Sequence, residues 1–322
     1  MKFSLLYLAE PKFGGWVSFT EHLYRCLKSQ GHTVNLYTVG ARLAPTLLPY
    51  SGSVMTQRIP AQAVSELSGA LIVTALDSKN LEAANVLRSR KAAYVVHDPT
   101  ELDDERTAVF RKANHIFAIR KTMGAVLSGK GLASSFIPHP YAPSNPTRNP
   151  SRNAVAFSRL DWDKHTDLIA EANTIVPANR RCCIYGAENT IYTFHKINTR
   201  FPNWRNNYYG KFERTEGAGA RLAASANWVV DMSAIKDDGC GTQYTFLEAW
   251  DGGAALIVNT KWTKDNKGEL RDGFNCLAAR DGAHLAALLE RQPSAEIIEN
   301  GRRTLVEHLP ASVSDKVCAA FL

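Results

Sequence analysis

The sequence has few cysteines, and none of the six stands in a C-x-x-C pair with the spacing of a metal site. Cys182 and Cys183 are adjacent in a segment that we predict to be a strand. Their side chains would point to opposite faces and could not easily form a disulfide. The pattern favours a reducing compartment, so we expect a cytoplasmic protein, in the host cytoplasm if the source is viral.

Long hydrophobic runs are also missing. The N-terminal apolar run, residues 3–9, is too short for a signal-peptide core followed by a cleavage site. No other window has the length that a bilayer span requires, so we expect a soluble chain without stable membrane insertion. No cluster of aspartates suggests a bound metal ion, and we predict neither a metal site nor a required cofactor.

What the sequence does have is the composition of a folded protein with a basic surface. Of its 322 residues, 45% are hydrophobic and 21% are charged, which is enough apolar material for one large domain or two ordinary ones. The formal net charge of +7 suits an anionic partner. That partner could be nucleic acid, an anionic membrane surface or a phosphate-bearing substrate, and the charge does not choose among them.

The first half of the chain alternates short apolar strands with helices. Residues 3–8 and 33–39 read as strands on either side of a glycine turn and an amphipathic helix over 17–29, a βαβ unit that implies parallel strands. Further strands are predicted at 70–75, 93–96, 115–119 and 135–137. This alternation is typical of an α/β layered fold.

A second α/β half follows a proline-rich stretch at 138–152, which we predict to be an exposed linker. Its expected strands are residues 154–157, 181–185, 207–209, 228–232 and 255–258, and residues 294–322 look helical with a break near Pro310. Two such halves predict a ligand cleft lined by the carboxyl ends of strands.

Three constellations carry chemistry. In the first, Arg159 and Lys164 lie five residues apart in the sequence, between a predicted strand and a helix. Both cations can reach one pyrophosphate there, with the helix N-terminus assisting. The alternative is a solvated turn with two surface cations.

The second constellation is a glycine-containing loop, residues 238–243, that leads into a helix. Backbone N–H groups at such a loop can cradle a phosphate. Glu248 lies one turn inside the helix, where a carboxylate can accept both hydroxyls of a ribose. The alternative for Glu248 is an ordinary surface charge.

The third constellation is the pair His97 and Asp98, at the end of a predicted strand in the first half. A histidine that faces a cleft can bind a substrate hydroxyl or stabilise developing charge. A purely structural histidine is the competing interpretation.

Together these segments resemble the retaining glycosyltransferases of family 4, which have the GT-B fold. Residues 158–165 (S-R-L-D-W-D-K-H) fit the family's G-R-L-x-x-x-K-G element, and residues 248–255 (E-A-W-D-G-G-A-A) fit E-A-M-A-x-G-x-P. Residues 272–277 (D-G-F-N-C-L) fit its late D-G-x-N-G-L turn. Each element is weak alone, but three in the right order are specific.

The resemblance implies an α/β protein of two Rossmann-like domains that face a central cleft. It implies an acceptor-binding domain over residues 1–147, a nucleotide-sugar domain over 148–305, and a C-terminal helix over 306–322 that packs back on the first domain. The implied activity is retaining, metal-independent sugar transfer from a UDP-sugar, by a chain that we expect to be a monomer or weak dimer.

The resemblance also implies roles for individual residues. Arg159 and Lys164 would bind the donor diphosphate, and Glu248 would hold the donor ribose. His97 would sit beside the transferred sugar, and the catalytic residues would be His97, Asp98, Arg159 and Lys164. Backbone and side-chain groups for the phosphate and sugar would come from Gly241, Thr242, Gln243, Tyr244 and Thr245, and close backbone approach would come from Gly14 and Gly15.

One position departs from the family pattern. The family places a glutamate eight residues before the ribose glutamate, and here that position is Cys240. The nearest acid is Asp238, which we expect either to take over contact with the sugar hydroxyls or to mark a pocket remodelled for another sugar.

A narrower resemblance concerns the acceptor. The glycine turn and helix at the start, residues 95–98 (V-V-H-D) and residues 244–248 (Y-T-F-L-E) are similar to the DNA α-glucosyltransferases of T-even phages. That resemblance implies UDP-glucose as donor and a 5-hydroxymethylated pyrimidine in double-stranded DNA as acceptor. An enzyme acting on a base in a duplex must reach it through the groove or flip it out, and Trp16, Tyr141 and Trp262 are candidate loop residues for insertion.

Residues 192–214 interleave cations with aromatic rings, as nucleic-acid surfaces do. The cations that we expect to contact DNA are Lys196, Arg200, Arg205 and Lys211, with a second basic loop at Lys261 and Lys264. The alternative is that half of the rings belong to the core and the cations form a solvated face.

Two other functions remain open. A transferase acting on surface polysaccharide or lipid-linked sugar would use the basic charge to dock on a membrane, but the helix over 17–29 carries acid and histidine and looks like an ordinary core helix. A non-catalytic sugar-nucleotide or DNA-binding module would not need Arg159, Lys164 and Glu248 together.

Overall fold

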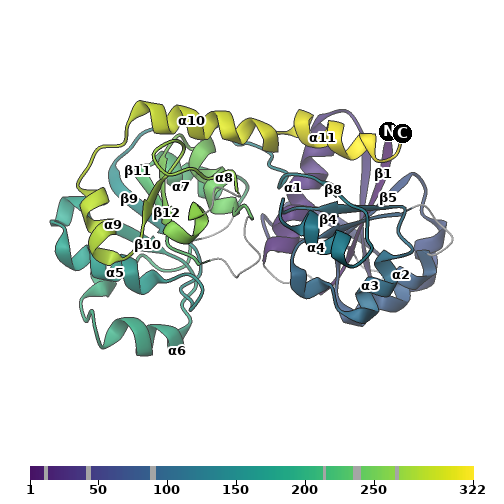
Figure 1. Ribbon diagram of the computed structural model, residues 1–322, viewed down its shortest axis with the longest axis horizontal. Helices are drawn as coiled ribbons and strands as arrows, with labels where there is room; N and C mark the ends of the chain where they lie inside the picture. The colour runs from purple at the N-terminus through teal and green to yellow at the C-terminus, as the bar shows by residue number, and fades with distance from the viewer. Residues whose placement is uncertain (11–13, 41–44, 88–91, 213–214, 235–240, 265–267) are drawn as a thin grey trace. The chain divides into compact units, whose positions relative to one another are not determined.

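The computed structural model describes residues 1–10, 14–40, 45–87, 92–212, 215–234, 241–264 and 268–322 (Figure 1). The chain divides into two compact units. Unit 1 comprises Met1–Ala142 and Glu307–Leu322, and unit 2 comprises Pro143–Val306. Each unit is built on its own sheet.

Unit 1 contains an eight-stranded sheet with the order β3-β4-β2-β1-β5-β6-β7-β8. From β4 to β8 in this order, every pair of neighbouring strands is parallel, whereas β3 pairs antiparallel with β4. The strands are β1 (Lys2–Leu8), β2 (Thr33–Val39), β3 (Thr46–Leu47), β4 (Met55–Ile59), β5 (Ala70–Leu76), β6 (Ala92–Val96), β7 (His115–Ala118) and β8 (Ser135–Phe136). The helices are α1 (Gly15–Ser29), α2 (Leu81–Val86), α3 (Asp104–Phe110), α4 (Met123–Gly129) and α11 (Pro310–Ala319), with 3₁₀ turns η1 (Ala61–Glu66), η2 (Ser78–Asn80), η4 (Pro99–Glu101) and η10 (Val306–His308).

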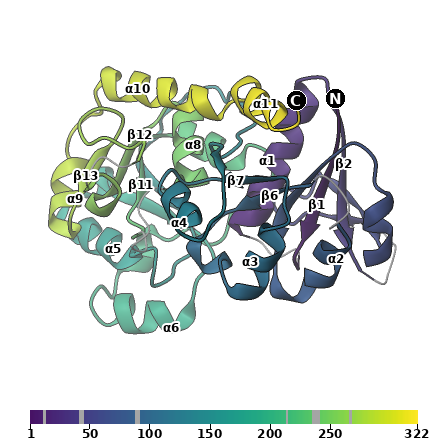
Figure 2. The same ribbon diagram turned by 45° about the vertical axis from the view of Figure 1, so that its right-hand side comes forward.

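Alternating residues of β1 separate the two faces of this sheet, as the period of two in a strand requires. Phe3 and Leu5 belong to a core that includes residues of α1 and α11, and Leu6 belongs to a second core with residues of α2, α3 and α4. The helix α11 lies beside α1 in both views, and Val313 and Val317 enter the same core as Val17 (Figures 1 and 2).

Unit 2 contains a five-stranded parallel sheet with the order β10-β9-β11-β12-β13. Its strands are β9 (Arg152–Phe157), β10 (Cys182–Tyr185), β11 (Ala226–Asp231), β12 (Ala255–Asn259) and β13 (Leu277–Ala279). Its helices are α5 (Thr166–Ile175), α6 (Thr190–Thr193), α7 (Ala218–Ala224), α8 (Tyr244–Asp251), α9 (Gly282–Leu289) and α10 (Ala295–Leu305), with the π turn η6 (Phe194–Asn198) and the 3₁₀ turns η5 (Ala178–Arg180), η7 (Trp204–Asn207) and η8 (Thr260–Trp262).

Helices cover both faces of the unit 2 sheet. Trp228 and Val230 of β11 share a core with α5 and α9, while α7 and α8 pack against β11 and β12 and against each other. The two sheets therefore confirm the α/β layered architecture that the alternating pattern predicts.

Two sequence-based predictions are wrong. Residues 207–209 form no strand, because the chain there follows the 3₁₀ turn η7 around the buried Trp204. The Trp204 indole N–H donates to Asn198, and a single bridge joins Tyr208 to Ile184. The stretch 138–152 is not exposed throughout.

The first residues of the stretch 138–152 are buried because they are hydrogen-bonded to the C-terminal segment of unit 1. Tyr141 N donates to His308 O at 2.8 Å, and His308 Nδ1 lies 2.8 Å from His139 O. The predicted helix break near Pro310 is confirmed, since α10 ends at Leu305 and α11 begins at Pro310. Among the helices in the described part of the chain, none combines the length and apolar character that crossing a bilayer requires.

Candidate functional site

The loop after β9 carries the first predicted pair of cations to the carboxyl edge of the unit 2 sheet. Lys164 is half-buried, and its Nζ donates to Gln243 Oε1 at 2.8 Å, although the two residues are 79 positions apart. The loop is fixed further by the Ala234 N–H, which donates to Asp163 O at 3.0 Å just beyond β11. The structure thus brings the first two sequence constellations into contact.

Arg159 is more exposed than Lys164 and is held by acidic neighbours. Its guanidinium donates to Asp161 at 3.1 Å and to Asp163 at 2.8 Å, while 57% of its side chain remains exposed. Burial works to raise the pKa of Asp161, but the Trp162 N–H, the Asn189 amide and Arg159 together hold that pKa below its ordinary value. An anionic ligand at Arg159 would have to compete with two charged carboxylates.

The start of α8 is the second part of this site. Gln243 occupies the N-cap position, and its side chain turns to Lys164 instead of capping the helix N–H groups. The positive end of the helix dipole therefore lies beside the Lys164 ammonium, an arrangement that favours an anion. Gly241 and Tyr244 are half-buried and Thr245 is buried, and the Thr242 hydroxyl donates to the Glu269 carboxylate, a partner that the sequence did not reveal.

Glu248 lies inside α8 and is only 4% exposed. Its carboxyl group packs against the backbone of Gly219 on α7, where a Cβ atom would come within 2.2 Å of Glu248 Cδ. A side chain at position 219 would therefore displace the carboxylate. Gly219 was missed by sequence reasoning, and the small-residue run 218–220 is the one signal that marks this close helix contact.

The turn at residues 272–277, which matches the family's late element, holds two helices in place. The buried Asn275 amide donates to Glu269 O at 2.8 Å and to the Thr304 hydroxyl at 2.9 Å. Asn275 O also accepts the Trp250 indole N–H at 3.4 Å, so the turn anchors α8 and α10.

Asp238 and the departing position Cys240 lie outside the described residues.

In unit 1, His97 follows β6 and is 6% exposed. Its Nε2 lies 2.7 Å from Thr74 O, and because a carbonyl can only accept, Nε2 must carry the proton. Burial is the main cause that lowers the pKa of His97 to about 4, so the ring is neutral at physiological pH with Nδ1 as its acceptor. The neighbouring Asp98 is bound instead to Arg120 at 3.0 Å and caps η4 through Thr100.

A pocket of about 430 Å³ opens at the carboxyl ends of β1 and β5 in unit 1. Its described lining residues are Tyr7, Ala9, Glu10, Gly14, Gly15, Trp16, Asp77 and Lys79. It includes both predicted glycines and Trp16, which belongs to the first turn of α1 and not to a loop as expected. The Trp16 indole N–H donates to Glu101 at 2.9 Å, a residue that sequence reasoning missed.

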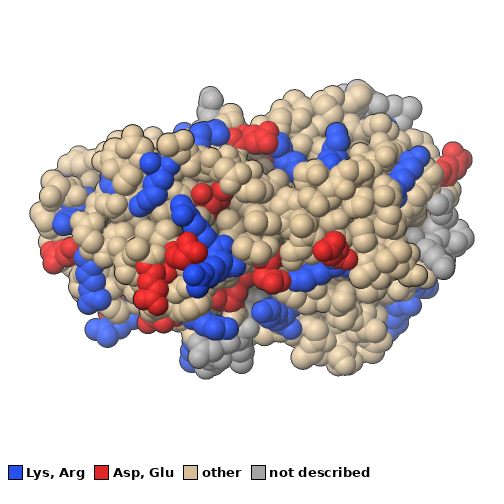
Figure 3. Space-filling model, turned by 90° about the horizontal axis from the view of Figure 1, so that it is seen from above, with Lys and Arg blue, Asp and Glu red and all other residues tan. Residues whose placement is uncertain are grey.

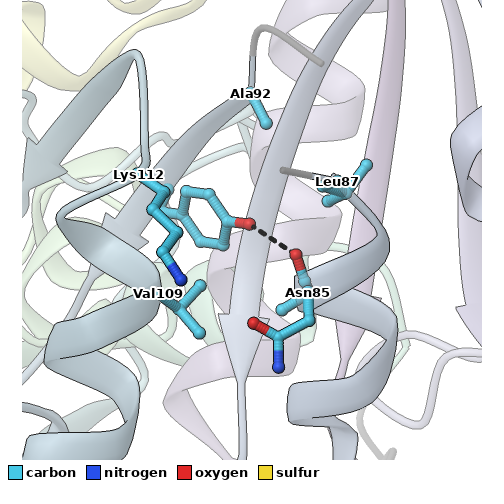
Figure 4. Close-up of a pocket in the computed structure, with 7 residues that line it drawn as sticks. Asn85, Leu87, Ala92, Val109 and Lys112 are labelled. Carbon is cyan, nitrogen blue, oxygen red and sulfur yellow. Dashed lines mark hydrogen bonds between the residues drawn. The ribbon is translucent and has the colours of Figure 1, made fainter. Parts of the chain in front are cut away.

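A second hollow, between α2, α3 and β6, is no site. It encloses only about 10 Å³, and Tyr94 Oη donates across it to Ala84 O at 3.4 Å (Figure 4). Asn85, Val109 and Lys112 line the same space.

The cations expected to contact DNA are exposed, but several already have partners. Arg205 pairs with Glu188 at 2.8 Å, and Lys196 Nζ lies 5.4 Å from the centre of the Trp162 ring. Arg200 lies 3.9 Å from Asp167, while Lys211, Lys261 and Lys264 are exposed. Of the interleaved rings, Tyr192, Phe201 and Trp204 are buried. Figure 3 draws the side of α10 and not that of α6, and on this face basic side chains are interspersed with acidic ones.

Two of the three candidates for base insertion are core residues. Tyr141 is 2% exposed, and Trp262 is 5% exposed with its indole N–H donated to Ser233 O at 2.8 Å. Neither ring can leave its place without breaking the core around it, so the prediction that they insert into a duplex is wrong. Trp16 is half-buried at the pocket of unit 1.

No protein-family model and no curated protein matches this chain. Solved structures do resemble it along its whole length. The Anabaena protein Alr3699/HepE, in complex with UDP and glucose, has a TM-score of 0.74 at 13% identity, over 100% of this chain and 99% of that one. An α-glucosyltransferase in complex with UDP and a 13-mer DNA containing an HMU base has a TM-score of 0.74 at 12% identity, over 99% and 98% of the two chains.

The pneumococcal O-GlcNAc transferase GtfA, in complex with UDP and GlcNAc, has a TM-score of 0.73 at 10% identity, over 99% and 98% of the two chains. These proteins share one architecture with the two parallel sheets described above. The chain therefore has the GT-B fold, with two Rossmann-like domains.

Proposed function

We propose that this chain is a glycosyltransferase that moves a sugar from a UDP-sugar to an acceptor hydroxyl, with retention and without a metal ion. The observation that carries the proposal is the contact between Lys164 and Gln243 at 2.8 Å. It joins the loop after β9, which also carries Arg159, to the start of α8, and we propose that these two cations and the helix dipole bind the diphosphate.

The reaction needs charge stabilisation on the leaving group. The bond between the anomeric carbon and the UDP oxygen breaks, and a bond from that carbon to the acceptor oxygen forms on the same face of the sugar. The acceptor proton passes to an oxygen of the departing diphosphate. Lys164 and Arg159 stabilise the negative charge that develops there, which is the largest single contribution to many enzymatic rates.

The other donor contacts follow from the same arrangement. Glu248 would accept the ribose hydroxyls, with Gly219 leaving room for its carboxylate. Asp238 would contact the sugar. UDP-glucose is the proposed donor, supported by HepE complexes that contain UDP-glucose or UDP with glucose.

For the acceptor we propose a 5-hydroxymethylated pyrimidine in double-stranded DNA. Support comes from the α-glucosyltransferase of the same fold that was crystallised with DNA containing an HMU base. The exposed cations Lys196, Arg200, Arg205, Lys211, Lys261 and Lys264 would contact phosphates. Trp16 and the neutral His97 would contact the base and its hydroxyl from unit 1.

A glycan acceptor is the second candidate, and the unit 1 pocket favours it. Among the lining residues that the structure describes, two are acidic, Glu10 and Asp77, and one is basic, Lys79. Such a lining suits neutral hydroxyl groups better than phosphates, because like charges repel.

The deciding experiment is incubation with UDP-glucose and duplexes that carry hydroxymethylcytosine, hydroxymethyluracil or no modification, analysed by mass spectrometry. We expect a hexose on the hydroxymethylated duplexes alone. Binding to duplex should fall steeply with salt, because each neutralised phosphate releases counterions. Glycan labelling without DNA labelling would favour the second candidate, and no turnover of several UDP-sugars would contradict the glycosyltransferase proposal.

A further inference from the structure

A buried acid of unit 1, Glu101, connects two of the candidate site residues. It lies at the end of η4 and is 3% exposed. Its Oε1 accepts the Trp16 indole N–H at 2.9 Å, and its Oε2 accepts the His97 backbone N–H at 3.0 Å. One carboxyl group therefore ties the first turn of α1 to the end of β6.

What Glu101 holds in place is a wall of the unit 1 pocket. Trp16 lines that pocket, whereas Glu101 is not among the residues that line it. The residues just before Trp16 are glycines, and a Cβ atom added to Gly14 or Gly15 would meet nothing within 4 Å. The Trp16 ring packs against the unit 1 core, and its N–H bond to Glu101 is the polar contact that sets the direction of the indole within that packing.

The second bond of Glu101 acts on His97 at the point where the chain leaves β6. The His97 ring packs edge-on against Phe19 at 4.8 Å and lies 6.1 Å from the Trp16 ring. With Nε2 donated to Thr74 O, the ring presents Nδ1 as an acceptor. The position of the His97 backbone therefore helps to decide where that acceptor points.

We propose that Glu101 is a positioning residue that, as a carboxylate, orients Trp16 and His97 for the acceptor substrate. The inference rests on the proposed function, since it assigns the acceptor side to unit 1. A carboxylate suits the task because it accepts two N–H groups at once, while a protonated carboxyl keeps only one strong acceptor oxygen. Deprotonation of Glu101 would strengthen both contacts.

The residues around Glu101 place its deprotonation within the physiological pH range. Burial is the main cause that raises the pKa of Glu101 to about 7, against the lowering effects of the His97 N–H, the Trp16 N–H and the Arg106 guanidinium. Asp98 also raises the pKa of Glu101, and Asp98 is itself bound to Arg120. His97, whose backbone N–H donates to Glu101, stays neutral because its pKa is lowered to about 4. Acceptor use should therefore improve as pH rises through about 7.

The first test needs no enzyme activity. The fluorescence of Trp16 is obtained as the difference between the wild-type protein and Trp16→Phe, which removes one of six tryptophans. We expect this signal to titrate near pH 7 in the wild type and to lose that transition in Glu101→Gln, which has no titratable group. Glu105→Gln, an exposed glutamate on α3, is the matched control and should titrate like the wild type. An unchanged transition in Glu101→Gln would overturn the proposal.

The second test separates positioning from general destabilisation. With UDP-glucose and a hydroxymethyluracil duplex as probes, Glu101→Gln should raise the acceptor KM about tenfold, the size expected when a charge-assisted hydrogen bond is lost. The KM for UDP-glucose should not change. Trp16→Phe keeps an aromatic ring but lacks the N–H, so it should show a similar acceptor effect while Glu101 keeps its bond to the His97 N–H. Equal increases in both KM values would mean a merely structural role and overturn the proposal.

If the wild type transfers no sugar to any acceptor, the proposed function fails, while the fluorescence test still decides whether Glu101 holds Trp16.

Discussion

Arg159 in unit 2 and the pair His97 and Glu101 in unit 1 are held in opposite ways. In unit 2, Arg159 is 57% exposed and its partners Asp161 and Asp163 come from the same loop. In unit 1, His97 and Glu101 are buried, and the contacts that orient them come from other strands and helices. Arg159 is therefore ready to exchange protein carboxylates for a ligand, whereas His97 and Glu101 are preorganised.

This difference has an energetic cause. An exposed ion pair contributes little to stability, so breaking it to bind a diphosphate costs little. A buried carboxyl such as Glu101 is costly to ionise and costly to leave without its partners. The role proposed for Arg159 thus depends on its charge, and the role proposed for Glu101 depends on its geometry and on pH.

The largest effect should come from the charge on which unit 2 depends. Lys164→Ala should lower kcat by about 10²- to 10³-fold, as the loss of one preorganised donor at a developing charge does. Steady-state kinetics with UDP-glucose would measure it, with circular dichroism to verify folding. Lys130→Ala, which changes an exposed lysine in unit 1, is the control. Turnover near the wild-type value would remove Lys164 from the diphosphate site.

The next effect should appear in unit 1 as a dependence of stability on pH. The pKa of Glu101 is raised from 4.5 to about 7, so the folded state holds the proton more tightly than the unfolded state. The raised pKa therefore adds to the free energy of unfolding. This added stability is complete below pH 4.5 and is lost as pH rises through 7, by about 3 kcal/mol in total.

Urea unfolding at a series of pH values would measure this loss, and Glu101→Gln should abolish it. A parallel pH dependence in the wild type and the variant would show that Glu101 does not titrate in this range.

A smaller effect should follow from the helix contact behind Glu248. Gly219→Ala places a Cβ 2.2 Å from Glu248 Cδ, so we expect a destabilisation of about 1–3 kcal/mol together with weaker UDP binding by calorimetry. Gly124→Ala in α4 is the matched control, since its Cβ would meet nothing within 4 Å. Unchanged UDP affinity in Gly219→Ala would argue against a ribose role for Glu248.

The smallest effect should come from an exposed ion pair of unit 2. Arg205→Ala should cost about 0.2–1 kcal/mol of stability. Burial works to raise the pKa of Glu188, but the Arg205 and Thr193 hydrogen bonds hold it below its ordinary value. The stabilisation is therefore present at neutral pH and is lost as pH falls through the lowered pKa.

If the acceptor is DNA, Arg205→Ala should also weaken duplex binding and reduce its salt dependence, measured by fluorescence anisotropy. Arg303→Ala, which breaks the similar exposed pair with Glu299 on α10, is the control. Equal duplex binding by both variants would favour the glycan acceptor.

The sequence by itself determined the features that depend on neighbours along the chain. Short apolar strands alternating with helices were enough to predict two α/β halves with parallel strands, because hydrophobic periodicity and helix-end signals depend on neighbouring residues. The pair Arg159 and Lys164 was recognisable for the same reason, since both lie on one loop between a strand and a helix. The break at Pro310 is local too, since proline starts a helix readily but cannot continue one.

Only the tertiary structure decided which distant residues meet. Lys164 contacts Gln243 across 79 residues, and Trp16 contacts Glu101 across 85, because the order of the parallel strands brings their carboxyl ends together. Burial could not be inferred from residue type either. The rings of Trp204 and Trp262 look like surface aromatics in the sequence, but their indole N–H groups find partners inside unit 2 and the rings fill its core.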